Sequence, residues 1–424
     1  MLRTTLCTML RKKLKNGLTT AGISVIALLA MGAPAAAQQE EVLFNLTFAA
    51  SGLGCNPQAG FIKDSKGNLY GATGVCGPGE QGTVFALSRK RNGAWGAKVL
   101  HAFLSSTYDG QRPLANVVFD KKGNLYGTTY FGGKSNRGTV YELMPQADGT
   151  WQEQQLYSFR AGTDGQFPRS TVIFDSGGNL YGTTTIGGTD NTGTAFELMP
   201  QANGAWKEKI LHNFLYPGTD GFDPEAGLVL DAAGNLYGTT AIGGLYDRGT
   251  VFELTPGANG DWTEKILYNF TTNADANFPN AVLTFDAAGN LYGTTAQGGL
   301  YGWGTVFELS PGEGGEWAEK ILFNFANDNL SGTNPYDSVI FDSAGNLYGT
   351  AQGGGLYDYG VVFKLIPSAS GDWAESVLYN FGSYAEDAAY PGSGGVIFGP
   401  GGGLYGTTIN GGTTGYGTIY EITP

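Results

Sequence analysis

Cysteine, histidine and basic residues are scarce in this sequence, and each shortage excludes a class of function. The 424 residues include three cysteines and two histidines, and their spacing matches no zinc site. Lys and Arg number 24 against 37 Asp and Glu, which gives a net charge of −13. Such an acidic chain is a poor partner for nucleic acid or an anionic membrane. We therefore expect no metal or other cofactor, no nucleic-acid partner and no stable membrane insertion.

A long hydrophobic run is also absent after residue 37. Residues 1–37 open with five basic side chains, continue with an apolar stretch at 21–31 and end in Ala35, Ala36 and Ala37. This order is typical of a signal peptide with an A-x-A cleavage site, and the stretch is shorter than the ~20 residues of a membrane span. We expect a signal peptide at 1–37 and an exported domain at 38–424, secreted or periplasmic, with a net charge of −18.

One motif, Gly-Asn-Leu-Tyr-Gly-Thr-Thr, dominates the rest of the chain. Seven copies or close variants occur, spaced 55 to 57 residues apart. A fixed period of this length indicates one structural unit repeated along the chain. The copies begin at Gly67, Gly123, Gly178, Gly234, Gly289, Gly345 and Gly402.

Each repeat contains four short β-type runs and no helical periodicity. In the repeat near residue 240 these runs are 228–231, 236–240, 250–255 and 262–270, separated by turns rich in Gly, Asn and Asp. Pairing the last two runs about their turn places Glu253 opposite Lys265, a cross-strand charge pair. Four antiparallel strands repeated radially are typical of a propeller blade. The sequence therefore predicts an all-β fold, a seven-bladed β-propeller of four-stranded blades.

The two ends of the chain are expected to close the ring. The last repeat stops after its third strand at 420–422, whereas residues 42–46 resemble the fourth-strand residues 266–270. We predict that this N-terminal strand completes the last blade and removes two exposed edges. In that register Glu41 faces Glu421. Cys55 and Cys76 lie in loops of the first blade that should open on one face, which predicts a disulfide in an oxidising compartment.

The sequence resembles a known family of bacterial repeats. The motifs that carry the resemblance are G-N-L-Y-G-T-T, G-G-x-x-x-x-G-T-V-F-E-L and W-x-E-K-I-L-Y-N-F, found for instance at 234–240, 243–254 and 262–270. They resemble the Gloeobacter–Verrucomicrobia repeats over essentially all of residues 41–424. The resemblance implies an exported repeat protein and brings no established activity or catalytic residue. The sequence lacks the C-terminal sorting segment that many relatives have, so we expect secretion or periplasmic residence rather than surface anchoring.

Catalytic chemistry has little support in the sequence. His101 and His212 take the place of aromatic residues in the fourth-strand motif and lack the Ser or Cys context of a catalytic base. Each of three loops that enter a blade carries an Asp-Gly turn, at Asp109, Asp164 and Asp220. Turn formation, calcium binding and glycoside cleavage are the alternatives for these aspartates.

The favoured binding surface is the face that bears the loops between second and third strands. The residue just before the glycine of the third strand differs from copy to copy, while the glycines stay constant. Neighbouring aromatic rings suit a sugar or a peptide, and packing of loop against loop is the alternative. The predicted binding residues are Tyr130, Phe131, Arg137, Tyr246, Arg248, Tyr301, Trp303, Tyr357, Tyr359 and Tyr416, with Asp109, Asp164 and Asp220.

We expect a monomeric, non-catalytic module that binds an extracellular polysaccharide or protein. The alternatives are a carbohydrate-active hydrolase or lyase that uses the loop aspartates, and a purely structural envelope protein. The fold hosts both binding and catalysis. Product release that Asp→Asn variants abolish would distinguish an enzyme from a binding module.

Overall fold

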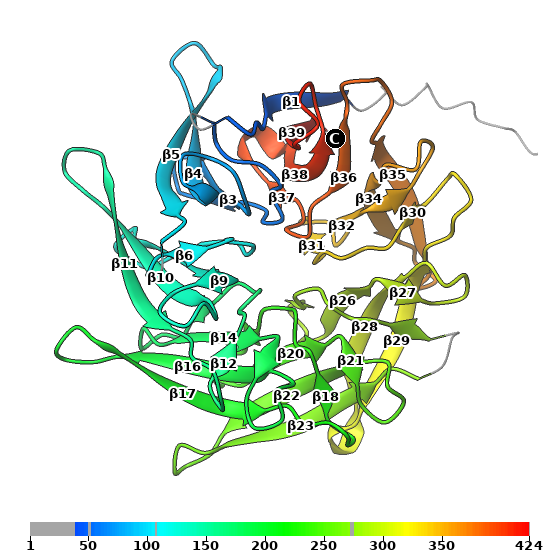
Figure 1. Ribbon diagram of the computed structural model, residues 1–424. Coiled ribbons are helices and arrows are strands. Elements are labelled where there is room, and N and C mark those ends of the chain that lie inside the picture. The colour runs from blue at the N-terminus through cyan, green and yellow to red at the C-terminus, as the bar shows by residue number, and fades with distance from the viewer. Residues whose placement is uncertain (1–38, 50–51, 107, 272–274, 424) are drawn as a thin grey trace, which may run out of the picture. The chain divides into compact units, whose positions relative to one another are not determined.

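Four short antiparallel strands recur in every repeat, as predicted. The computed structural model describes residues 39–49, 52–106, 108–271 and 275–423. These residues form seven sheets of four or five strands arranged around a central axis (Figure 1), and five two-stranded ribbons. The predicted signal peptide lies outside the described residues. Among the described residues, no helix has the length and hydrophobicity to cross a membrane.

The strands of blades 1 to 4 follow one another in chain order within each sheet. They are β2 (Ile62–Lys63), β3 (Leu69–Thr73), β4 (Glu80–Arg89) and β5 (Trp95–Leu104); β7 (Val118–Phe119), β8 (Leu125–Thr129), β10 (Thr139–Pro145) and β11 (Trp151–Ser158); β13 (Ile173–Phe174), β14 (Leu180–Thr184), β16 (Thr194–Pro200) and β17 (Trp206–Asn213); and β19 (Val229–Leu230), β20 (Leu236–Thr240), β22 (Thr250–Pro256) and β23 (Trp262–Asn269).

Blades 5 to 7 repeat the arrangement, and short 3-10 turns occur at Glu313–Gly315 and Pro400–Gly402. The strands are β25 (Thr284–Phe285), β26 (Leu291–Thr295), β28 (Thr305–Pro311) and β29 (Trp317–Asn324); β31 (Ile340–Phe341), β32 (Leu347–Ala351), β34 (Val361–Pro367) and β35 (Trp373–Asn380); and β36 (Ala388–Pro391), β37 (Ile397–Phe398), β38 (Leu404–Gly411), β39 (Thr418–Thr423) and β1 (Gln39–Asn45).

The N-terminal strand closes the ring, which confirms the prediction from the sequence. β1 pairs with β39, and Glu41 lies opposite Glu421. A third residue offsets the like charges, because the Arg89 Nη2 atom lies 3.3 Å from Glu421 Oε2. The register shifts between Val42 and Phe44, as it does at the equivalent place in the outer strand pair of blade 4, so the closing strand keeps the bulge of the other outer strands.

The repeated motif is explained by close packing within each blade. Gly238 lies opposite Phe252 in the β20–β22 pair, and a Cβ atom at Gly238 would be 2.6 Å from the Phe252 ring. The buried hydroxyls of Thr240 and Thr250 lie 2.8 Å apart. The distance between strands, and not a ligand, therefore explains the recurring glycine, whereas the threonine pair is replaceable, since blade 6 has Ala351 in place of its first member.

The turn aspartates have the structural role predicted for them. Asp231 Oδ1 accepts hydrogen bonds from the backbone of Ala233 and Asn235, at 2.9 and 2.8 Å. Its Oδ2 accepts one from the Tyr237 hydroxyl at 3.2 Å. The same turn recurs at Asp120, Asp175, Asp286 and Asp342.

The predicted register of the outer strands is confirmed, whereas the predicted charge pair is wrong. Glu253 lies opposite Lys265, yet Glu253 Oε1 accepts a hydrogen bond from Tyr237 on the other neighbouring strand, at 3.0 Å. Lys265 Nζ donates instead to the carbonyl of Gly315 in the next blade. The long lysine side chain reaches across the blade interface, so it joins blades rather than strands.

Candidate functional site

The two sets of loops named by the sequence open on one face, as expected. In five repeats the loop that enters the first strand pairs with the loop after the second strand in a two-stranded ribbon. The ribbons are β6 (Gly110–Gln111) with β9 (Phe131–Gly132), β12 (Gly165–Gln166) with β15 (Ile186–Gly187), β18 (Gly221–Phe222) with β21 (Ile242–Gly243), β24 (Ala276–Asn277) with β27 (Gln297–Gly298), and β30 (Gly332–Thr333) with β33 (Gly353–Gly354).

The variable position before the third strand has a constant backbone role. Its carbonyl accepts a hydrogen bond from the entering loop of the next blade in all seven repeats, for example from Asn334 to Trp303 at 2.9 Å. Because the backbone group makes this contact, the side chain is unconstrained by it. The seven carbonyls belong to Gln81, Arg137, Thr192, Arg248, Trp303, Tyr359 and Tyr416.

In blades 4 to 7 the predicted aromatic side chains are exposed. The exposed fraction of Tyr301 is 56% and that of Trp303 is 39%. The remaining exposed rings of the predicted set are Tyr246, Tyr357, Tyr359 and Tyr416. Large exposed rings on the loops of one face provide contact area for a partner.

In blades 2 and 3 the predicted aromatic residues pack on one another instead. The rings of Tyr130 and Phe131 both contact Phe167, with ring centres 5.3 and 5.5 Å apart. The guanidinium of Arg137 lies 5.1 Å from the centre of the Phe167 ring. Here the loops pack against each other, which was the alternative considered for the aromatic residues. Arg248 also makes an interaction with other residues.

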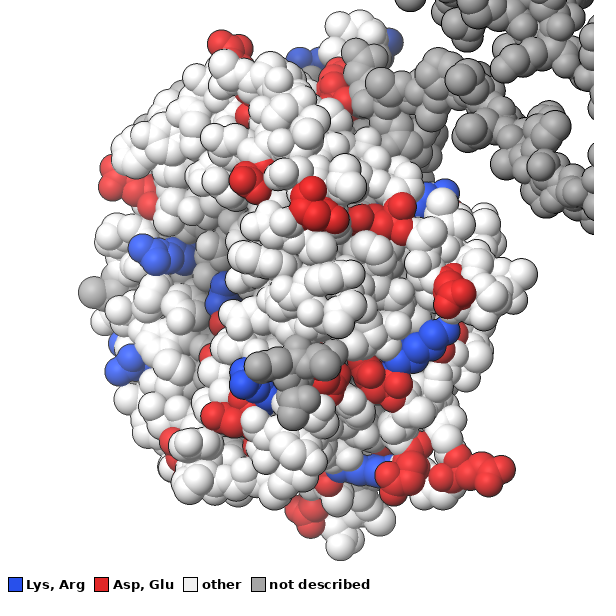
Figure 2. All heavy atoms as spheres, turned by 90° about the vertical axis from the view of Figure 1, so that its right-hand side faces the viewer, with Lys and Arg blue, Asp and Glu red and all other residues white. Residues whose placement is uncertain are grey.

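A groove between blades 5 and 6 brings two of the exposed rings together. Tyr301 and Trp303 line it on one side, and the loop after β29 lines the other with Asn327, Asp328 and Leu330. The groove has a volume of about 680 Å³, within the range of roughly 300–1,000 Å³ of small-molecule sites. On the side of the molecule that carries β29 and β35, acidic side chains lie in small groups (Figure 2).

The three loop aspartates hold the loops in which they lie. Asp109 Oδ2 accepts a hydrogen bond from the backbone of Leu104 at 2.7 Å. Asp164 and Asp220 accept equivalent bonds from Arg160 and Leu215, at 2.9 and 3.0 Å. Turn formation therefore explains their position.

Each loop aspartate, and Asp275 in the same place of blade 5, also lies near a glutamate on the fourth strand of the blade that its loop enters, which the sequence analysis did not single out. Burial, and then the neighbouring Asp275, raise the pKa of Glu319 to about 8. Burial raises the pKa of Glu153 and Glu208 to about 7, with Asp109 and Asp164 as the second causes. The raised pKa favours the protonated form of these glutamates up to near-neutral pH, each beside an aspartate. The W-x-E spacing could have identified these glutamates, because the glutamate recurs two residues after the tryptophan.

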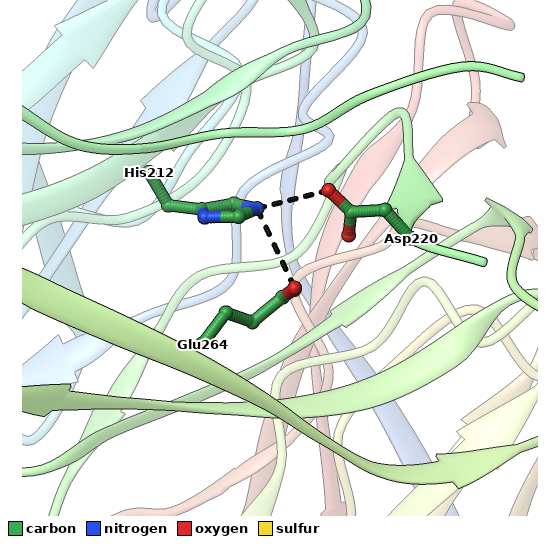
Figure 3. Close-up of side chains that lie close together, drawn as sticks. All are labelled: His212, Asp220 and Glu264. Carbon is green, nitrogen blue, oxygen red and sulfur yellow. Dashed lines mark hydrogen bonds and ion pairs between the residues drawn. The ribbon is translucent and has the colours of Figure 1, made fainter. Parts of the chain in front are cut away.

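In the cluster of His212, Asp220 and Glu264, a histidine nitrogen lies close to both carboxyl groups (Figure 3). His212 Nε2 lies 3.0 Å from Asp220 Oδ2 and 3.6 Å from Glu264 Oε2. Burial, and then Asp220, raise the pKa of Glu264 well above its ordinary value. An imidazole and two carboxylates within 4.8 Å of one another are groups that could hold a divalent metal. In other blades Tyr157 and Tyr268 take the place of the histidine and bond to the aspartate at 2.9 and 3.0 Å.

Repeats of one four-stranded blade, closed by the chain's own N-terminal strand, define a seven-bladed β-propeller. The chain belongs to the Gloeobacter/Verrucomicrobia repeat family, whose model matches residues 56–288 and 278–424. This result confirms the resemblance found in the motifs. A search of curated protein sequences finds no match.

Solved structures of similar fold differ widely in what their titles say. A putative oxidoreductase (glucose dehydrogenase) from Thermus thermophilus has 18% identity and a TM-score of 0.42, over 73% of this chain and 96% of that one. A protein of unknown function from Dyadobacter fermentans has 11% identity and a TM-score of 0.41, over 92% and 100%. A sialidase from Trypanosoma rangeli has 12% identity and a TM-score of 0.41, over 79% of this chain and 57% of that one. These likenesses carry no argument about function.

Proposed function

We propose that this protein is an exported, non-catalytic module that binds an extracellular polysaccharide in the groove between blades 5 and 6. The observation that carries the proposal is the pairing of two exposed rings, Tyr301 and Trp303, in one groove with polar side chains. Aromatic rings pack on the C–H face of a sugar, while amides and carboxylates bond to its hydroxyls. An open groove accepts an internal segment of a long chain.

The environment of the loop aspartates favours binding over catalysis. A glycosidase needs one carboxylic acid and one carboxylate free to approach the scissile bond. Asp109, Asp164 and Asp220 each accept a backbone hydrogen bond of their own loop. Glutamates with raised pKa values recur beside them in successive blade interfaces, as expected for a feature of the scaffold.

The test is co-sedimentation of the purified protein with a panel of insoluble and soluble neutral and acidic polysaccharides, with supernatants assayed for new reducing ends. We expect binding without released sugar, weakened at least tenfold in Trp303→Ala, because a central aromatic contact is lost. Tyr246→Ala is the matched control, since Tyr246 is an exposed ring of the equivalent loop in blade 4 and lies outside the groove.

Other outcomes would overturn the proposal in different ways. Release of sugar that Asp220→Asn abolishes would make the protein an enzyme. Equal binding by Trp303→Ala and the parent would exclude the groove. Absence of both binding and release would leave a protein partner or a structural role in the envelope, and cross-linking in intact cells would then identify neighbours.

A further inference from the structure

A second cavity, in the middle of the ring, is built from all seven blades. Its volume is about 420 Å³, also within the range of roughly 300–1,000 Å³ of small-molecule sites. Six blades contribute the residue that directly follows a proline of the entering loop. These residues are Gln58, Leu114, Arg169, Glu225, Asn280 and Tyr336, and each is half-buried. In blade 7 the same position is Gly392, and the next residue, Ser393, lines the cavity.

The backbone at this place is alike in every blade and unusual. The residue before the proline has a positive φ between 53° and 60° in all seven repeats, although none of the seven is glycine. Such conformations cost about 1–3 kcal/mol each. The N–H group of each of these residues donates to the preceding blade, as Phe278 does to Arg248 at 3.3 Å. The ring of contacts therefore fixes the position and direction of the residue that faces the cavity.

The side chains that face the cavity are not determined by this backbone. The same geometry accepts an amide, a leucine, an arginine, a glutamate and a tyrosine in different blades. If these side chains served only to pack the ring, one residue type would suit all the positions, as it does for the adjacent prolines. Different side chains around one cavity instead form a surface whose chemistry can complement that of a ligand.

The cavity is polar but carries no net formal charge. Arg169 Nη1 lies 2.6 Å from Glu225 Oε1, so the one cation and the one anion of the lining neutralise each other. Asn280 Oδ1 is buried and lacks a hydrogen-bond partner among the described residues. A buried acceptor of this kind is normally satisfied by water or a ligand. Five amides are present, on Gln58, Asn116, Asn280, Gln297 and Gln352.

This lining suits a neutral ligand with many hydroxyl groups. An amide carries both donors and an acceptor, which is what a hydroxyl needs; of the five amide oxygens, only that of Asn116 already accepts a hydrogen bond from the described residues, from the Gly60 N–H at 2.6 Å. The rings of Tyr336 and Phe278 supply an apolar surface for C–H groups. A free anion would need an unpaired cation, and Arg169 is already paired. We propose that this central cavity binds a neutral sugar ring, as a site separate from the groove of Trp303. The two sites share no lining residue.

The test is isothermal titration of the purified protein with glucose, galactose, mannose, xylose, cellobiose and maltose, with glucuronic acid and glucosamine as charged counterparts. We expect one neutral sugar or more to bind at a 1:1 ratio, at least tenfold more tightly than the charged sugars. Asn280→Leu should weaken this binding at least tenfold. The substitution installs the residue that blade 2 carries at the same position, so the fold already accepts it.

A second variant guards against an indirect effect of the first. Tyr336→Gln installs the residue of blade 1 and should also weaken binding at least tenfold, whereas Trp303→Ala should leave it unchanged. The proposal is overturned if none of the six neutral sugars binds, if charged sugars bind equally well, or if both cavity variants bind like the parent. If the parent binds polysaccharide but none of the six neutral sugars, the proposal for the central cavity fails while the proposal for the groove stands.

Discussion

The interface between blades 7 and 1 and the interface between blades 3 and 4 perform the same task with opposite chemistry. Between blades 3 and 4, His212, Asp220 and Glu264 meet as a polar cluster. At the equivalent positions between blades 7 and 1, Phe44, Leu53 and Ala97 replace all three residues. Phe44 and Leu53 pack there against an apolar cluster. In the loop beside them the disulfide joins Cys55 and Cys76, whose Cα atoms are 5.4 Å apart.

The difference shows that the polar cluster is one solution to blade packing and not a requirement of the fold. The ring closes within blade 7, through the non-covalent β1–β39 pair, and the disulfide cross-links the loop by which β1 continues into blade 1. A covalent cross-link and apolar contacts do not depend on protonation, whereas a carboxylic acid beside a carboxylate does. The apolar interface is therefore insensitive to pH, and the polar interfaces are not.

The largest expected effect is a loss of stability as pH rises. Below the ordinary pKa of 4.5 a glutamate is protonated in both the folded and the unfolded chain. Between 4.5 and the raised pKa the folded chain binds more protons, so the free energy of unfolding falls as pH increases. Burial raises the pKa of Glu40 and Glu319 to about 8 and that of Glu153, Glu208 and Glu375 to about 7. A pKa raised by one corresponds to about 1.4 kcal/mol, and solvent screening of these partly exposed groups reduces the sum, so we expect a loss on the order of 5 kcal/mol between pH 5 and pH 8.

The measurement is urea denaturation at several pH values, with Glu264→Gln/Glu319→Gln as the matched variant. Glutamine keeps the neutral shape of the protonated acid, so the double variant should lose less stability between pH 5 and pH 8 than the parent. Parallel pH profiles for parent and variant would show that these carboxyl groups do not hold a proton in the folded chain.

Removal of the disulfide should have the next largest effect. Cys55→Ser/Cys76→Ser opens a loop with a sequence separation of 21 residues, and the loop-entropy model gives a cost of about 3 kcal/mol. Urea denaturation of the variant should show this loss at pH 5 and at pH 8 alike, because the apolar interface has no shared proton. A thiol assay of the unfolded, unreduced parent should find neither cysteine free. An unchanged urea midpoint would mean that the apolar contacts hold the closure by themselves.

The smallest effect is expected for His212→Tyr, which gives the polar cluster the residue found in equivalent clusters. The Tyr268 hydroxyl bonds to Asp275 Oδ2 at 3.0 Å, and a tyrosine at 212 can reach Asp220 in the same way. We expect a change in the free energy of unfolding of less than about 1 kcal/mol. Thermal unfolding with and without a chelator checks this. One neutral hydrogen bond contributes less than about 2 kcal/mol. A loss of stability above that value in the variant, together with an equal loss when the chelator is added to the parent, would indicate a metal at His212.

The sequence predicted the repeated parts of this protein well because seven copies repeat the same physical constraint. Glycine faces an aromatic residue in all seven blades and the threonine pair recurs in six, so the strands, their register and the number of blades could be read from the pattern. The closing strand was predictable for the same reason, since residues 42–46 match the outer strand of a repeat. The disulfide followed from two cysteines in loops of one face.

The candidate sites were predictable only in part, because each combines residues from different blades. Trp303 could be identified as a variable loop residue, yet its partners in the groove, such as Leu330, come from the next blade. The sequence also assigned the glutamates that face lysines to ion pairs, since strand register does not show which neighbour a long side chain will reach. The central cavity was missed, because the residues after the prolines become one surface only when the ring closes.

The sequence by itself determined the blade, the count of blades and the closure, since these depend on local spacing and on residues that recur. The tertiary structure alone decided which variable residues meet, because side chains from different repeats become neighbours through blade packing. It also decided which carboxyl groups have raised pKa values, because burial beside the preceding blade raises the pKa of Glu319 and its equivalents. The sequence of each repeat determines its own strands and turns, whereas the binding surfaces and the raised pKa values of the glutamates depend on contacts between repeats.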